Sequence, residues 1–326
     1  MSDDEVEAPT WASSGYVISA RVFGTMPHPI SRAEYEDLAH RADDLTAIIE
    51  LEEAYDVLVR NYLSLEKAHA STLVDFMVTR PRSRLDYERR RREADRQLVN
   101  LLASGEMYAE HLPRILKRRQ RAAKACGRPF PASAIAAVER AAEEQRAKFL
   151  GVRALEAMRN HVLHLSLPVK GWNQGNAWVP HEGKEVMRTT YTVGLRPASI
   201  GDVAKADPAL VAELEARADN KGRVAWLPLA REYVEGASYV HKAARDALAS
   251  LETECLSVIG AAVETYRTAT SMPAETEGMM AVAKVGSRWS LADERAIDFD
   301  YDEQVGDLRA TNAAPLINLH RRQFLA

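Results

Sequence analysis

Three polar residues near the end of one long segment combine side-chain types that suit phosphate chemistry. They are Arg159, Asn160 and His164, in the pattern Arg-Asn-x3-His that closely precedes Leu167-Pro168. An imidazole titrates near neutral pH, so His164 could accept or donate a proton during a reaction. Arg159 carries a permanent charge and a planar fork of donors for phosphate oxygens, and Asn160 could orient either the phosphate or the imidazole.

Helix geometry limits how these three residues could act together. Successive residues of an α-helix are rotated by about 100°, so Asn160 and His164 lie about 40° apart, one turn from each other on one face. By the same geometry Arg159 and His164 lie about 140° apart. Arg159 would therefore have to curl around the helix, or a second copy of the motif would have to complete the site.

Ordinary structural roles could also explain the same three residues. Arg159 could pair with a carboxylate, either that of Glu156 or one on another helix, and Asn160 could cap backbone carbonyls. His164 could be an ordinary histidine in the last turn of a helix, where exposed carbonyls favour the imidazolium form. These alternatives need no reaction, and they stay open at this point.

A metal site at the motif is a weaker alternative. His161 and His164 lie three residues apart on the expected helix, with Glu156 nearby, but no second cluster supplies the remaining ligands at a recognisable spacing. We therefore expect neither a metal nor another cofactor. His161 and Glu156 are instead candidates for supporting positions around the motif, together with Asn100, which we expect to be buried among leucines and to need a hydrogen-bond partner.

Helical periodicity dominates the chain around the motif. Apolar residues recur at helical spacing within 44–78, 83–125, 133–166 and 227–270, and a shorter helix is expected at 207–218. Prolines such as Pro81 separate these stretches, and Ser133 is a plausible N-cap. Because each long apolar stripe must be buried against another, the pattern predicts a mainly α protein built as an antiparallel helical bundle.

Segments with β character lie outside the long helices. Residues 16–25, 187–195 and 280–285 are candidate strands, which we expect to form small β decorations at one end of the bundle, and 170–180 has the composition of a loop. The expected organisation is an N-terminal extension at 1–30, a helical domain at 31–270 and a mixed C-terminal extension at 271–326. The loop and one short strand are inserted into the helical domain at 169–198.

The motif and its setting resemble the HEPN superfamily, helical-bundle proteins in which Arg-x4–6-His on the third core helix forms a metal-independent endoribonuclease site. Arg159, Asn160 and His164 match that motif residue for residue, Asn100 lies in the apolar run of the preceding helix, and a long helix closes the domain. The likeness covers about residues 44–270. It implies an antiparallel HEPN-like bundle with these three catalytic residues, cleaving RNA by attack of the 2′-hydroxyl to leave a 2′,3′-cyclic phosphate.

The resemblance also implies partners and a biological setting. HEPN nucleases are typically homodimers in which both motifs face one groove, which agrees with the wide angle between Arg159 and His164. A toxin-like or phage-defence effector, held in check by a neutralising partner protein, is the implied role. The alternative is a noncatalytic helical binding or oligomerisation module, because many proteins of this fold have no activity.

A basic segment and a tryptophan-containing loop are the expected RNA contacts. Residues 81–128 contain 14 Lys or Arg against 6 Asp or Glu, although the whole chain has a net charge of −4. Basic side chains could hold an RNA backbone, and indoles could stack on unpaired bases. The candidates are Arg82, Arg84, Arg89, Arg92, Arg96, Trp172 and Trp178. The alternatives are a solvated helix face with offsetting acids, and tryptophans that pack on the bundle.

Composition and sequence patterns exclude several other classes. With 46% apolar and 28% charged residues and no biased block, the chain resembles ordinary globular proteins rather than disordered ones. No stretch approaches the roughly 18 apolar residues that a membrane helix needs, and the acidic start differs from a signal peptide, so we expect a soluble, cytoplasmic protein. Cys126 and Cys255 are read as ordinary thiols. No P-loop or Rossmann glycine pattern is present.

Overall fold

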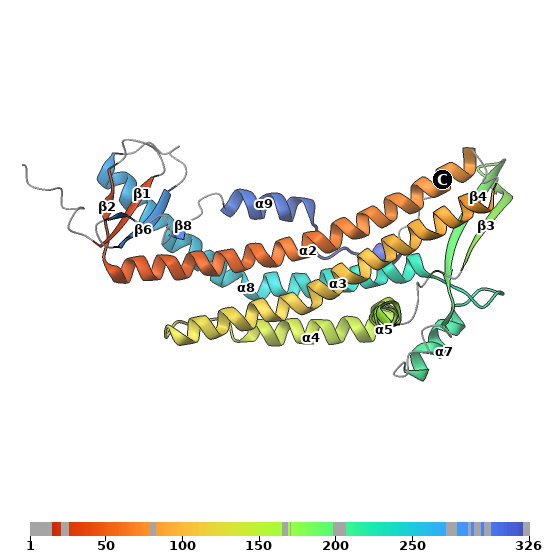
Figure 1. Cartoon of the computed structure of the whole chain (residues 1–326), viewed down its shortest axis with the longest axis horizontal. Coiled ribbons are helices and arrows are strands. Elements are labelled where there is room, and N and C mark those ends of the chain that lie inside the picture. Colours follow the sequence, from red (N-terminus) through yellow and green to blue (C-terminus); the bar gives the residue numbers. More distant parts are fainter. Residues whose placement is uncertain are drawn as a thin grey trace, which may run out of the picture. The chain divides into compact units, whose positions relative to one another are not determined.

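The computed structural model describes residues 15–20, 26–78, 83–164, 169, 171–197, 207–271, 279–285, 288–289, 295–296 and 301–321. Long helices account for much of this part, namely α2 (Arg32–Val78), α3 (Arg84–Ala125) and α8 (Trp226–Thr270) (Figure 1). The shorter helices are α4 (Ser133–Lys148), α5 (Leu150–His164), α7 (Pro208–Ala216) and α9 (Tyr301–Thr311). The prediction of a mainly α protein with small antiparallel sheets is confirmed.

The chain divides into two compact units, and each long helix contributes to both. The first unit comprises Met1–Glu52, Ile115–Ala134 and Arg245–Thr311. The second comprises Glu53–Arg114, Ile135–Ala244 and Asn312–Ala326. The motif helix α5 belongs entirely to the second unit.

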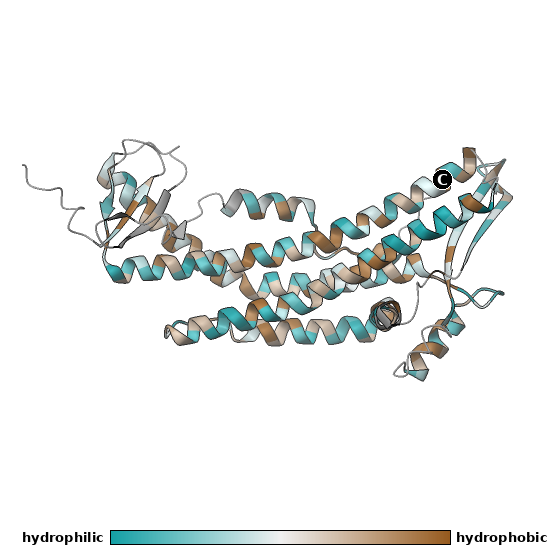
Figure 2. Cartoon of the chain, viewed as in Figure 1, coloured by the Kyte–Doolittle hydropathy of each residue, from teal (hydrophilic) through white to brown (hydrophobic). Residues whose placement is uncertain are grey.

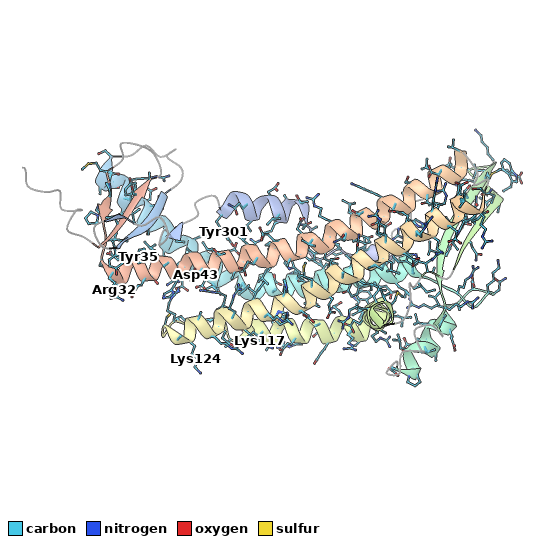
Figure 3. The ribbon with its side chains drawn as sticks, in the orientation of Figure 1. Arg32, Tyr35, Asp43, Lys117, Lys124 and Tyr301 are labelled. Atoms are coloured by element: carbon cyan, nitrogen blue, oxygen red, sulfur yellow. The ribbon has the colours of Figure 1, made fainter. Side chains whose placement is uncertain are left out.

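The first unit is held together by buried ion pairs and a small sheet. Asp44, 3% exposed, accepts a hydrogen bond from Arg119 at 2.7 Å, and Glu52, 1% exposed, accepts one from Arg245 at 2.6 Å. Strand β1 (Tyr16–Ala20) pairs antiparallel with β6 (Met279–Val285), and β2 (His28–Pro29), β7 (Arg288–Trp289) and β8 (Arg295–Ala296) extend the sheet. Figure 3 places Tyr35 near the start of α2, where its ring lies 4.9 Å from that of Tyr16.

Helix α2 begins twelve residues before the predicted start at 44, because Ser31 and Glu34 form a reciprocal cap. The Glu34 N–H donates to the Ser31 hydroxyl at 3.2 Å, and the Ser31 N–H donates to the Glu34 carboxylate at 2.7 Å. This Ser-x-x-Glu arrangement satisfies two backbone donors at a helix start. The signal is present in the sequence, and the prediction missed it because it relied on the apolar stripe.

The core of the second unit lies between the predicted apolar stripes of its helices. The side chains of Leu58, Leu98, Leu101 and Leu155 are all 0% exposed. Figure 2 shows apolar residues recurring along the long helices and a strongly hydrophilic stretch in the N-terminal half of α3. None of the described helices is both long enough and apolar enough to cross a membrane.

The single helix predicted over 133–166 is wrong in one respect, because the chain breaks at Phe149. Helix α4 lies in the plane of Figure 1, whereas α5 is seen end-on, so the chain turns sharply between them. A Cβ at Gly151 would lie 2.2 Å from the Leu229 carbonyl oxygen, which shows how closely α5 approaches α8. The Glu232 carboxylate of α8 accepts the Gly151 N–H at 2.6 Å. This contact satisfies a donor in the first turn of α5 and so stabilises the break.

The stretch 170–180, predicted as a loop, is mostly a strand. β3 (Gly171–His181) pairs antiparallel with β4 (Lys184–Leu195), from Gly171 opposite Gly194 to His181 opposite Lys184. Glu182 and Gly183 form the two-residue turn with positive φ values of 48° and 76°, the geometry favoured in tight hairpins. Gly and Asn are weak strand formers, so the pairing with the β-branched residues of β4 decides the structure here.

The predicted grouping of the strands is also corrected. β4 pairs with β3 and with β5 (Val224–Ala225) in the second unit, whereas β1 and β6 form their sheet in the first unit. The candidate strands therefore do not share one sheet. The C-terminal segment continues into the second unit, where backbone N–H groups of Asn318 and His320 donate to the buried Glu235 carboxylate at 3.1 and 3.2 Å.

Candidate functional site

Contacts along α5 fix the helix that carries the motif. Besides the bond from Gly151 to Glu232, Arg153 forms a bidentate ion pair with Glu213 of α7, at 2.7 and 2.8 Å. The most deeply buried side chains of the helix, each no more than 1% exposed, are those of Ala154, Leu155 and Met158. The motif begins at Arg159, directly after Met158. Its backbone position is therefore determined by core packing and by ion pairs near the start of the helix.

Arg159 is the motif residue whose side chain the structure describes most fully. Its guanidinium forms an ion pair with Glu106 of α3, and the two side chains are 32% and 31% exposed. This is the alternative in which Arg159 pairs with a carboxylate on another helix. Glu156, the partner considered within α5, instead pairs with Arg146 of α4 at 3.3 Å. Glu106 both orients the guanidinium and offsets its charge.

Asn160, His161 and His164 lie in the last turns of α5, and their side chains are outside the described part of the structure. Their helical backbone keeps Asn160 and His164 one turn apart on one face. A common groove reached by Arg159, Asn160 and His164 remains a prediction.

Glu156 occupies a partly desolvated position. Burial raises the pKa of Glu156, Arg146 opposes this increase, and the neighbouring carboxylate of Glu106 adds to it. Two carboxylates, those of Glu106 and Glu156, therefore meet two guanidinium groups, those of Arg146 and Arg159.

A cavity of about 380 Å³ lies beside Arg159 in the second unit, between α3, α4, α5 and α8. Buried side chains form its floor, among them Leu102, Tyr108, Leu112, Val138, Val152 and Leu155. Exposed or half-exposed residues form its opening, namely Glu106, Ala109, Glu139, Ala142, Glu156 and Arg159. The cavity is therefore open to the surface, apolar inside and mostly acidic at its edge.

Tyr233 of α8 lies against α3 in the wall of this cavity. A Cβ at Gly105 would lie 2.1 Å from the Tyr233 hydroxyl, so any side chain larger than glycine would displace the tyrosine. Burial raises the pKa of Tyr233, and the carboxylates of Glu156 and Glu106 raise it further. The hydroxyl therefore stays protonated and acts as a donor at neutral pH.

Asn100 is placed differently from the prediction. Its side chain is half-buried rather than enclosed among leucines. A contact between Asn100 and the motif remains a prediction, because the side chains of Asn160, His161 and His164 lie outside the described part of the structure. Leu98, Leu101 and Leu102 turn one face of α3 into the core, and Asn100 lies on its flank because each residue rotates by about 100°. Position within an apolar run did not determine burial here.

The two tryptophans of β3 have different surroundings. Trp172 stacks on Tyr87 and Phe76, with ring centroids 4.5 and 5.2 Å apart, and is half-buried. Trp178 is 63% exposed. Trp172 therefore packs on the helices, as the structural alternative expected, whereas the Trp178 indole is accessible to a ligand or partner.

The candidate arginines lie on the hydrophilic N-terminal part of α3, except for Arg82, which is outside the described residues. Arg84, Arg89, Arg92 and Arg96 are exposed. Arg96 pairs with Glu93 at 2.6 Å, and the Arg92 Nε donates to the Glu88 carbonyl at 3.2 Å. Arg96 therefore fits the alternative interpretation, in which the basic segment is a solvated helix face whose charges are offset by nearby acids.

Carboxylates also offset much of the remaining basic segment. Arg90 pairs with Asp75 at 3.2 Å, and Arg91 pairs with the buried Asp95 at 2.9 Å. The charge excess along the sequence therefore overstates the positive charge presented at the surface. Polyanion binding here would depend chiefly on Arg84, Arg89 and Arg92, since the Glu88 carbonyl that Arg92 contacts carries no charge.

Glu106, Gln145 and Tyr233 belong to the site region but were not predicted from the sequence. Glu106 and Tyr233 come from helices more than one hundred residues apart, and no motif links them. Gly105 was the one local indication, since a glycine inside a strongly helical segment often marks a close approach.

The described residues include no group of three or more His, Cys, Asp or Glu side chains placed to hold a metal ion. Comparisons of the chain with protein families, with curated proteins and with solved structures found no match.

Proposed function

We propose that this protein is a metal-independent endoribonuclease with a HEPN-like helical domain, in which Arg159, Asn160 and His164 are the catalytic residues. The observation that carries the proposal is the position of the motif. It closes α5 within a helical unit, and Arg159 lies partly exposed at the edge of a cavity that opens to the surface. An arginine in this position is accessible to a phosphate while its backbone is held by a packed helix.

The reaction needs proton transfer and charge stabilisation. The 2′-hydroxyl oxygen attacks the adjacent phosphorus, the bond from phosphorus to the 5′-oxygen breaks, and the products carry a 2′,3′-cyclic phosphate and a 5′-hydroxyl. A neutral His164 takes the 2′-hydroxyl proton, and a protonated imidazole gives a proton to the 5′-oxygen. Arg159 stabilises the negative charge on the phosphorane, and Asn160 orients the phosphate or the imidazole.

A homodimer supplies the groups that one helix cannot bring together. Arg159 and His164 are about 140° apart on α5, so two motif helices facing one groove would provide two imidazoles and two guanidinium groups. Mixing Arg159→Ala with His164→Ala subunits tests this arrangement. Activity above that of either variant alone supports a composite site, whereas a monomer that cuts RNA at high dilution contradicts it.

The proposed biological role is that of a cytoplasmic toxin-like or phage-defence effector, restrained by a neutralising partner protein. Arg84, Arg89, Arg92, Arg96 and Trp178 are exposed in the second unit and could contact RNA beyond the cleavage site.

A second candidate, a noncatalytic HEPN-like binding or oligomerisation module, is favoured by the pairing of Arg159 with Glu106. A carboxylate that already occupies the guanidinium competes with a phosphate. The ion pairs that offset the arginine charges along α3 also favour the noncatalytic module.

Incubating the purified protein with mixed cellular RNA in EDTA separates the two candidates. We expect cleavage that His164→Ala lowers by at least about 10²-fold, the lower range for loss of an acid–base group. Absence of cleavage by the dimeric protein, in the presence and absence of EDTA, would favour the noncatalytic module.

A further inference from the structure

The cavity beside Arg159 has the size and lining of a site for a small, mostly apolar molecule. Its volume of about 380 Å³ lies within the range of about 300–1,000 Å³ typical of small-molecule pockets. Val138, Val152 and Leu155 form part of its floor, and their side chains are at most 9% exposed. An apolar group that enters the cavity would leave water and contact apolar side chains from four helices, which is favourable.

The charged groups at the edge of the cavity are already engaged with one another. Acidic side chains outnumber basic ones there, but Glu106 pairs with Arg159, and Glu156 pairs with Arg146 at 3.3 Å. Glu139, the third carboxylate of the lining, also has an interaction partner. A charged ligand would have to replace one of these contacts and would lose its own hydration in the apolar interior, which is costly. The edge therefore favours a neutral ligand.

The Tyr233 hydroxyl offers a neutral ligand a hydrogen-bond donor. Within the described chain this hydroxyl makes no hydrogen bond, and it is not one of the buried polar atoms that lack a partner, so it retains accessible surface in the cavity wall. The charges of Glu106, Glu156 and Arg159 all act on it, which places it near the charged edge. Because the hydroxyl stays protonated, it can donate to an acceptor such as a carbonyl oxygen.

We propose that this cavity binds a neutral, mostly apolar carbonyl compound, with its hydrocarbon body on the floor formed by α3, α4, α5 and α8 and its carbonyl oxygen accepting a hydrogen bond from Tyr233. The matching chemistry is one carbonyl group on an aromatic or aliphatic body of about ten carbon atoms, a size that suits the volume. This inference goes beyond RNA cleavage and does not depend on it.

Calorimetric titration of the full chain with three probes of one size tests the preference for a neutral ligand. The probes 4-phenylbutan-2-one, 4-phenylbutan-2-amine and 3-phenylpropanoate share a phenylethyl body and are neutral, cationic and anionic at pH 7. We expect the ketone to bind with a Kd on the order of 0.1–1 mM, as is usual for a ligand of this size. The amine and the carboxylate should each bind at least about tenfold more weakly, because their charges would lose hydration.

Removal of one hydroxyl tests the proposed hydrogen bond. Tyr233→Phe keeps the ring in the cavity wall and should weaken the ketone by about threefold to tenfold, the range for one neutral hydrogen bond. Butylbenzene, which has no acceptor, should bind equally to the wild type and to this variant. Tyr239→Phe is the matched control, because Tyr239 lies on the same helix and does not line the cavity, and it should leave the ketone Kd unchanged.

Substitutions at the opening locate the binding in the cavity. Ala142 lines the opening and is exposed, so Ala142→Trp should fill the opening without disturbing the core and should abolish ketone binding. Ala147→Trp is the matched control, because Ala147 is exposed on the same helix and does not line the cavity.

No binding of the ketone, equal binding of all three probes, an unchanged ketone Kd in Tyr233→Phe, or full binding by Ala142→Trp would each overturn the proposal. If circular dichroism shows that Ala142→Trp is not folded, Ala109→Trp blocks the opening from α3 and is judged by the same criteria. RNA takes no part in these titrations, so their outcome is separate from that of the nuclease proposal.

Discussion

The guanidinium of Arg159 on α5 forms an ion pair with the carboxylate of Glu106 on α3. This contact joins the end of the motif helix to a second helix at the edge of the cavity. It holds the arginine in a defined place and also reduces the positive charge that a phosphate would meet. The electrostatics of the proposed site therefore depend on a residue outside the motif.

Replacing Glu106 with Gln should strengthen RNA binding, because the charge that offsets Arg159 is removed. We expect a decrease in Kd of about threefold at low salt, measured by fluorescence anisotropy with a labelled oligoribonucleotide. Glu110→Gln is the control, since Glu110 pairs with Arg114 at 2.8 Å one turn further along α3. An equal effect of both variants would show that the response reflects net charge rather than Arg159.

The buried pair of Glu66 and Arg231 should contribute strongly to the stability of the second unit. Both residues are 8% exposed, and Arg231 donates to both carboxylate oxygens, at 2.6 and 2.8 Å. Glu66→Ala should lower the free energy of unfolding by about 3–5 kcal/mol, because a buried guanidinium loses its bidentate acceptor. Urea denaturation measures this change.

The control is Glu36→Ala, which removes an exposed ion pair with Arg32 and should leave the urea midpoint unchanged. A midpoint for Glu66→Ala that matches the control would contradict the role given to the buried pair.

Burial of His69 should make stability fall in mild acid. Burial lowers the pKa of His69 below its ordinary value of 6.5, and the nearby Arg231 lowers it further, although Glu66 opposes the change. The unfolded chain therefore binds more protons than the native state just below pH 6.5. The stability due to neutral His69 is present above pH 6.5 and is lost as the pH falls toward the lowered native pKa.

Urea midpoints at several pH values between 5 and 8 measure this dependence. His69→Gln should flatten it over that range, whereas the exposed His111→Gln should not. Identical pH profiles for the wild type and His69→Gln would contradict the assignment.

Gly151 should be required for the break between α4 and α5. A Cβ there would lie 2.2 Å from the Leu229 carbonyl oxygen and 2.6 Å from the Glu232 Cβ, so Gly151→Ala must push α5 away from α8. We expect a loss of about 1–3 kcal/mol in the free energy of unfolding, typical of overpacking.

Gly260 is a matched control, because it lies within α8 and a Cβ there would meet no atom within 4 Å. Gly260→Ala should stabilise the protein by about 0.5–1 kcal/mol through helix propensity. Equal effects of the two substitutions would contradict the close packing described at Gly151.

Periodicity predicted the helical class and much of the core, because burial of a stripe follows directly from 3.6 residues per turn. The break at Phe149 was missed because its cause, the cap by Glu232, comes from a helix about eighty residues later. The β3–β4 hairpin was missed for a similar reason, since Gly and Asn have weak intrinsic strand preference and adopt the strand by pairing. At the site, the motif places Arg159 at the end of a helix, but its partnership with Glu106 depends on tertiary packing that no local pattern encodes.

The most direct test of the proposed nuclease uses one oligoribonucleotide with and without a single 2′-deoxy sugar at the cleavage position, in EDTA. The wild-type protein should cut the all-ribose strand, leave a 2′,3′-cyclic phosphate, and leave the substituted linkage intact, because the attacking hydroxyl is absent. His164→Ala should cut neither strand at a comparable rate. Cleavage at the 2′-deoxy position, or products ending in a 3′-hydroxyl, would contradict the proposed reaction.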